Sequence, residues 1–210
     1  MQNTLDASTG RAPLAAGFRD PVHDAQGCFR AIMNAMARPG TIQSLDAIDL
    51  QPPKPLTCTA AAVALTLFDY DTPVWLDRPL MASEDVKAFL RFHTGAPIVT
   101  APVEAAFALV SDPAHMPPLA GFNQGSAEYP DTSTTVILCG QDFSGGESVT
   151  LQGPGIKDTL PFAPHPLPPV FWDQIAANGR QFPRGIDIIF AGGRSLSALP
   201  RSTRITGREA

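Results

Sequence analysis

The sequence lacks any hydrophobic run long enough to cross a membrane. No unbroken apolar stretch is longer than the one over residues 60–65, whereas a membrane-spanning helix needs about 20 apolar residues. The first 16 residues also lack the apolar core of a secretory signal. We therefore expect no membrane association and a cytoplasmic location.

Cysteine is scarce, and positive charge is not in excess. The chain has three scattered cysteines, which are Cys28, Cys58 and Cys139. Their spacing fits neither a metal site nor an iron–sulfur site, and a disulfide framework needs more of them. The chain has 15 basic and 20 acidic residues, which gives a formal net charge of −5. A nucleic-acid partner is therefore not expected.

The overall composition is that of a globular protein rich in proline. The chain has 210 residues, of which 44% are hydrophobic and 17% charged. This length and composition suit one domain with a sizeable core. Proline accounts for 22 residues, roughly twice its usual share. Because proline stiffens loops and ends helices, we expect short elements and rigid connections.

The pattern of apolar residues predicts an α/β domain. Helices are expected over residues 23–37, 57–68, 83–95 and 169–177. Strands are expected over residues 74–76, 98–101, 106–110, 134–139, 147–152, 185–190 and 196–199. This order indicates α/β layers around a mixed sheet, with antiparallel pairs toward the C-terminus. Residues 1–16 are expected to form a frayed tail, and residues 17–206 a single domain.

The first helix carries the clearest apolar stripe. Its residues Phe29, Ile32, Met33 and Met36 follow one another at helical spacing. We therefore expect all four side chains to face the core.

No motif supplies a complete catalytic set. The glycine turns at residues 153–155 and 192–193 neither open a helix nor precede the Lys-Ser/Thr of a phosphate-binding loop. No Gly-x-Ser-x-Gly segment is present. None of the four histidines pairs with another at helical spacing or lies near a cysteine. The residues therefore indicate no catalytic residue and no metal site.

Charged residues at the ends of elements are the candidates for binding. Arg38, Arg91 and Arg201 each lie beside a turn or a helix end. With Asp71 and His93, they are predicted to line one cleft that holds an anion through bidentate guanidinium contacts. Simpler roles also fit these residues: surface ion pairs for the arginines, turn chemistry for Asp71 and a helix C-terminus for His93.

Six segments in a fixed order resemble the PhnH family, the H component of the bacterial carbon–phosphorus lyase system. The resemblance extends from about Gly17 to Arg204. The segments are residues 20–26 (DPVHDAQ) with the following Phe29-Arg30, 35–40 (AMARPG), 71–76 (DTPVWL), 91–97 (RFHTGAP), 182–187 (FPRGID) and 199–203 (LPRST).

This resemblance implies a role in phosphonate catabolism. Members of the family form a core complex with subunits G, I and J. With an ATP-binding subunit, that complex makes ribose 1-phosphonate 5-triphosphate from ATP and a phosphonate and displaces adenine, a transferase reaction. The J component later cleaves the carbon–phosphorus bond, the lyase step. The resemblance also implies a homodimer in isolation and a three-layer α/β/α sandwich similar to the large domain of pyridoxal-phosphate-dependent transferases.

The fold resemblance does not extend to the cofactor. Pyridoxal phosphate needs a lysine for its Schiff base. The chain offers Lys54 among prolines, Lys87 on a helix and Lys157 in a hairpin loop, and none is placed for a buried cofactor. We therefore expect no cofactor.

Three functions remain open at this point. The chain is a structural subunit of the complex, or a subunit whose arginine cleft binds phosphonate or ATP phosphates. The third is an anion-binding or vestigial transferase-fold protein that acts on its own.

Overall fold

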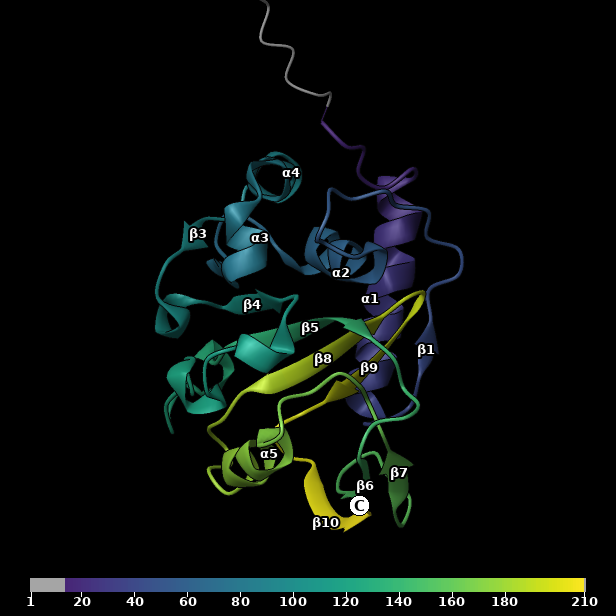
Figure 1. Ribbon diagram of the computed structural model, residues 1–210, viewed down its shortest axis with the longest axis vertical. Coiled ribbons are helices and arrows are strands. Elements are labelled where there is room, and N and C mark those ends of the chain that lie inside the picture. Colours follow the sequence, from purple (N-terminus) through teal and green to yellow (C-terminus); the bar gives the residue numbers. More distant parts are fainter. Residues whose placement is uncertain (1–13, 210) are drawn as a thin grey trace, which may run out of the picture.

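The computed structural model describes residues 14–209 and shows a sheet covered on both faces (Figure 1). The predicted tail therefore lies outside the described residues except for positions 14–16. The helices are α1 (Pro21–Ala37), α2 (Cys58–Leu67), α3 (Arg78–Ala82), α4 (Glu84–Thr94) and α5 (Phe171–Gly179). The strands are β1 (Gln43–Ser44), β2 (Val74–Leu76), β3 (Ile98–Val99), β4 (Phe107–Val110), β5 (Thr135–Gln141), β6 (Ser148–Gln152), β7 (Leu160–Phe162), β8 (Asp187–Gly192), β9 (Ser195–Leu199) and β10 (Arg204–Glu209).

The central sheet is mixed, as predicted. Its strand order is β1-β9-β8-β5-β4-β2-β3. Strands β3, β2, β4, β5 and β8 run parallel, whereas β9 is antiparallel to both β8 and β1. A second, antiparallel sheet has the order β10-β6-β7.

Alternating side chains of the central strands build two separate cores. Ile137 of β5 and Ile189 of β8 pack with helices α1, α2 and α4 on one face. Their neighbours Val136 and Ile188 pack with α5 and the small sheet on the other face. Because both faces are covered, β5 and β8 are apolar almost throughout, as expected for buried parallel strands. Figure 1 shows the four N-terminal helices on one side and α5 with β6, β7 and β10 on the other.

Helix α1 begins earlier than the sequence pattern predicts. Asp20 is its N-cap and accepts hydrogen bonds from the N–H groups of Val22 and His23, and Pro21 occupies the first turn. The bond from the His23 N–H, followed by the hydrogen bond between the His23 ring and the Asp20 carboxylate, lowers the pKa of the Asp20 carboxyl.

The predicted stripe of α1 is wrong for two of its four members. Phe29 and Met33 are 48% and 51% exposed, whereas Ile32 is buried. The helix instead buries its small residues, which are Cys28, Ala31 and Ala35. The reason is close packing: α1 lies against α2, whose buried face is formed by Ala60, Ala61, Ala62 and Ala64, and small residues let two helices approach closely.

Helix α4 and its two caps occupy the range predicted for it, residues 83–95. The Ser83 hydroxyl accepts from the N–H of Val86, and Gly95 ends the helix in the left-handed conformation. The very short strands β1 and β7 and the polar strand β10 were not predicted. Segments of two or three residues carry no period, and β10 is held by its pairing with β6. Within residues 14–209, no helix combines the length and hydropathy of a membrane span.

Candidate functional site

The guanidinium of Arg201 is fully engaged within the protein. Its Nε and Nη2 donate to the two carboxylate oxygens of Asp187 at 3.2 and 2.5 Å. Its Nη1 donates to the carbonyl oxygen of Pro130 at 2.6 Å. The side chains of Arg201 and Asp187 are only 14% and 13% exposed. Arg201 therefore ties the turn after β9 to the start of β8 and to the loop around Pro130, and each of its three guanidinium nitrogens already donates to a protein oxygen.

His93 is also used inside the molecule. It lies in the last turn of α4, and its Nε2 is 2.9 Å from the carbonyl oxygen of Ala15. Its ring contacts the rings of Phe89 and Phe92, with centroids 4.6 and 5.0 Å apart. His93 thus fixes the segment that enters the domain ahead of α1.

Asp71 belongs to a turn, which is the simpler of its two predicted roles. Its N–H donates to the Asp69 carboxylate at 2.9 Å, and the Thr72 hydroxyl hydrogen-bonds within the same turn. Among residues 14–209, no cluster of three or more histidine, cysteine, aspartate or glutamate side chains could hold a metal ion.

Arg38 and Arg91 are exposed, and neither has an ion pair among the described residues. Arg91 lies in the last turn of α4, which leads to β3, whereas Arg201 binds the first residue of β8. Strands β8 and β3 are four places apart in the sheet, which corresponds to about 19 Å. The structure therefore brings Asp71, Arg91 and His93 to one end of the sheet and keeps Arg201 with Asp187. Substrate binding by these five residues stays a prediction.

Asp77 is a residue that the sequence analysis missed. It follows β2 at the carboxyl edge of the parallel strands, the edge where open α/β sheets bind ligands. It is 4% exposed and accepts from the N–H groups of Leu80, Ser111 and Asp112 at 3.2, 2.6 and 2.8 Å. Its carboxylate joins β2 to β4 and caps α3. The signal in the sequence is an aspartate two residues before Pro79, a helix-start pattern.

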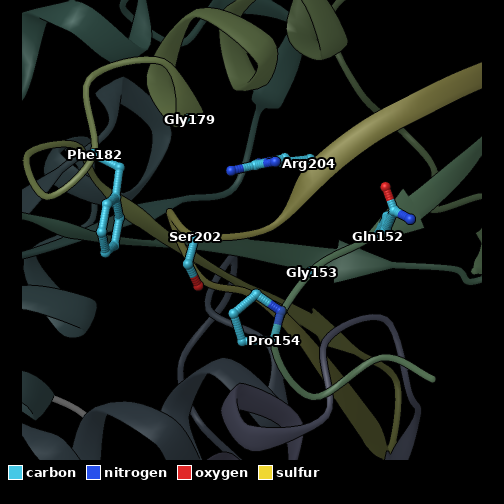
Figure 2. A pocket seen from close by; sticks show the side chains of 7 residues that line it. All are labelled: Gln152, Gly153, Pro154, Gly179, Phe182, Ser202 and Arg204. Carbon is cyan, nitrogen blue, oxygen red and sulfur yellow. The ribbon is translucent and has the colours of Figure 1, made fainter. Parts of the chain in front are cut away.

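A hollow lined by polar and apolar residues lies between α5, β6 and β10 (Figure 2). Its volume is about 470 Å³. Figure 2 shows the guanidinium of Arg204 projecting across it toward the side occupied by Phe182, with Ser202 and Pro154 below. We call this the Phe182 hollow; it is lined by Gln152, Gly153, Pro154, Gly179, Phe182, Ser202 and Arg204.

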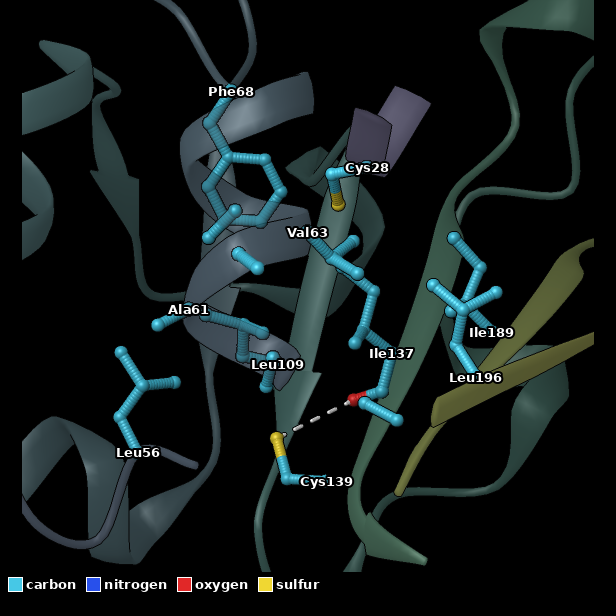
Figure 3. Packing of buried hydrophobic residues seen from close by; sticks show 14 of the residues in the cluster. Cys28, Leu56, Ala61, Val63, Phe68, Leu109, Ile137, Cys139, Ile189 and Leu196 are labelled. Atoms are coloured by element: carbon cyan, nitrogen blue, oxygen red, sulfur yellow. Dashed lines mark hydrogen bonds between the residues drawn. The ribbon is translucent and has the colours of Figure 1, made fainter. Parts of the chain in front are cut away.

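Two of the cysteines are buried structural residues. Cys28 and Cys139 are 0% and 3% exposed and lie in the helical core with Val63 and Ile137 (Figure 3). Burial raises the pKa of the Cys28 thiol to about 11 and raises that of Cys139 further. Because the thiolate is the reactive form, neither side chain is poised as a nucleophile.

The three lysines do not fit a Schiff-base role. Lys54 and Lys157 are exposed, and Lys87 forms an ion pair with Glu84 at 2.6 Å. A lysine that carries pyridoxal phosphate must instead reach a cofactor in a shielded pocket. The residues present therefore do not fit this cofactor.

Fold and site together define an α/β protein in which Asp77, His93 and Arg201 hold the protein's own segments together. Comparison with known sequences then gives the family. A family model described as bacterial phosphonate metabolism protein (PhnH) matches residues 16–206, so the chain belongs to the PhnH family.

Two relatives are informative. A protein of Rhizobium meliloti (strain 1021) is 41% identical over 198 residues, which cover 94% of this chain and 98% of that protein. It is named alpha-D-ribose 1-methylphosphonate 5-triphosphate synthase subunit PhnH. A protein of Stutzerimonas stutzeri, named putative C-P lyase subunit protein HtxG, is 28% identical over 183 residues, which cover 86% of this chain and 85% of that protein.

Proposed function

We propose that this chain is a subunit of the assembly that makes α-D-ribose 1-methylphosphonate 5-triphosphate during phosphonate catabolism. The observation that carries this proposal is the 41% identity to a relative of that name over nearly the whole of both chains. The family match over residues 16–206 supports one domain of this type spanning residues 17–206. The reaction is an ATP-dependent transfer that displaces adenine, and it takes place in the cytoplasm.

Within this assembly, the main role of the chain is to bind its partner subunits through its surface. Its expected partners are subunits G, I and J, together with a second copy of itself when isolated. The exposed apolar residues of α1 support a docking role: Val22, Phe29 and Met33 are 61%, 48% and 51% exposed. An apolar surface left by a close-packed helix pair is typical of a subunit contact.

The fold is further proposed to be related to the large domain of pyridoxal-phosphate-dependent transferases, without the cofactor. The layered arrangement around a mostly parallel sheet supports this relationship. The absence of the cofactor from this proposal agrees with the lysines, because Lys54 and Lys157 are exposed and Lys87 is paired with Glu84.

The proposal is tested by reconstitution. Subunits G, I and J are purified with and without this chain and assayed, with the ATP-binding subunit, for triphosphate product from ATP and methylphosphonate. We expect product only when the chain is present. An assembly that forms and works at full rate without the chain would overturn the proposal.

The docking surface has its own test. The double variant Phe29→Glu/Met33→Glu is expected to lose co-purification with subunits G, I and J or to lose the homodimer. Val170→Glu, which changes a 55% exposed residue on the opposite layer, serves as the matched control and keeps both. Equal behaviour of the two variants would show that α1 is not a contact surface.

The arginine cleft is tested separately. Arg91→Ala is expected to leave folding intact and to abolish growth on a phosphonate. Normal growth of that variant would remove the substrate-binding role of Arg91 and leave the structural role of the chain.

A further inference from the structure

The Phe182 hollow continues into a second one. The neighbouring hollow has a volume of about 550 Å³ and shares Gly179, Phe182 and Arg204 with the first. Both volumes fall in the range of small-molecule sites, roughly 300–1,000 Å³. The two hollows therefore form one extended cleft around the Phe182 ring and the Arg204 guanidinium.

The cleft carries positive charge only. Arg204 lines both hollows and Arg180 lines the second, whereas neither lining contains a carboxylate. Among residues 14–209, neither guanidinium takes part in an ion pair. Nearby Arg201 and Arg208 are by contrast paired with aspartates. Two unpaired guanidinium groups beside one cleft favour an anionic ligand, which each can bind through two N–H donors.

The cleft also presents a flat apolar ring, and a buried hydroxyl without a partner among residues 14–209 lies in its wall. Phe182 is 63% exposed, so a large apolar ring open to solvent borders the cleft. Thr203 lines the second hollow, is 3% exposed, and its hydroxyl has no hydrogen-bond partner among the described residues. An exposed ring beside two unpaired guanidinium groups matches a ligand that joins a planar ring to an anionic group, because the ring of the ligand stacks while its anion pairs.

We propose that this cleft binds a nucleoside phosphate, with the base stacked on Phe182 and the phosphate held by Arg180 and Arg204. The site is a property of the isolated chain and does not depend on its role in the assembly. A chain that fails to bind the nucleotide would therefore leave the proposed subunit role untouched, and a chain without that role would leave nucleotide binding untouched.

The test is calorimetric titration of the full-length protein with ADP, adenosine and inorganic phosphate. ADP is expected to bind, and adenosine and phosphate to bind at least tenfold more weakly, because each supplies half of the recognition. Absence of ADP binding at millimolar concentration would overturn the proposal. Inorganic phosphate binding as tightly as ADP would also overturn it, since the ring would then contribute nothing.

Matched variants assign the binding to this cleft. Arg204→Gln and Arg180→Gln are each expected to weaken ADP binding about tenfold, and Phe182→Leu to weaken ADP binding without affecting phosphate binding. Arg184→Gln changes an exposed arginine of the same segment that lines neither hollow, and it should bind ADP normally. Circular dichroism confirms that each variant is folded. Normal ADP affinity in Arg204→Gln, or an equal loss in Arg184→Gln, would refute this placement.

Discussion

Arg201 and Asp187 form a bidentate ion pair at one end of the neighbouring strands β8 and β9, where the turn after β9 meets the first residue of β8. The N–H of Arg201 also donates to the same carboxylate, at 2.7 Å. Arg201, which was predicted to bind substrate, thus connects strands β8 and β9 with the loop around Pro130.

Removing the ion pair between Arg201 and Asp187 should lower the stability of the fold. Arg201→Ala leaves the nearly buried carboxylate of Asp187 without its cation, and we expect a loss of about 3 kcal/mol in the free energy of unfolding. Urea denaturation measures it. Arg208→Ala breaks an exposed pair with Asp173, whose side chains are 36% and 70% exposed, and should cost less than about 1 kcal/mol. Similar losses in the two variants would contradict the structural role.

Asp77 should be as important to stability as Arg201. Asp77→Ala removes the acceptor of the N–H groups of Ser111, Asp112 and Leu80, and we expect a loss of about 3 kcal/mol. Ser111→Ala removes only the hydroxyl contact at 3.0–3.1 Å and should cost about 1 kcal/mol. Thermal unfolding of both single variants and of the double variant gives the interaction free energy between the Asp77 and Ser111 side chains. An additive double variant would mean that the two side chains do not interact.

The buried thiol of Cys28 should make stability fall at high pH. Its pKa is about 11 in the folded chain, above the ordinary value of 9.0. Between these pH values the unfolded chain releases the proton and the folded chain keeps it, so the stabilisation present below pH 9 is lost as the pH rises toward 11. The expected contribution is about 2 kcal/mol.

The measurement is urea unfolding from pH 8 to 11. Cys28→Ala should show a flatter decline than the unchanged protein. Ala35→Gly, a buried site on the same helix, should lower stability without changing the slope. A Cys28→Ala curve parallel to that of the unchanged protein would rule out this titration.

Two glycines of similar conformation should differ in their tolerance of a side chain. Gly145 and Gly155 have φ angles of +85° and +81°. A Cβ at Gly145 meets nothing within 4 Å, whereas at Gly155 it overlaps the carbonyl oxygen of Ala37. Gly145→Ala should cost only the left-handed backbone penalty of about 1 kcal/mol, and Gly155→Ala about 3 kcal/mol. Thermal unfolding of both variants decides; equal costs would mean that the hairpin of β6 and β7 does not pack on α1.

Local features of this fold, and its family, follow from the amino-acid order alone. The strand at residues 74–76 and the helix within residues 83–95 were both predicted, because short-range spacing and helix ends depend on neighbouring residues. The six family segments likewise identified the family without any contact information.

Which surfaces are buried, and what each charged residue touches, depends on contacts between distant segments. The buried face of α1 is set by the alanines of α2, about 30 residues further along the chain. Asp77 meets Ser111 across 34 residues, and Arg201 meets Pro130 across 71. Phe182, in the turn after α5, and Arg204, the first residue of β10, line one cleft although they lie 22 positions apart along the chain. Such contacts follow from strand order and layer packing, which the spacing of residues along one segment does not encode.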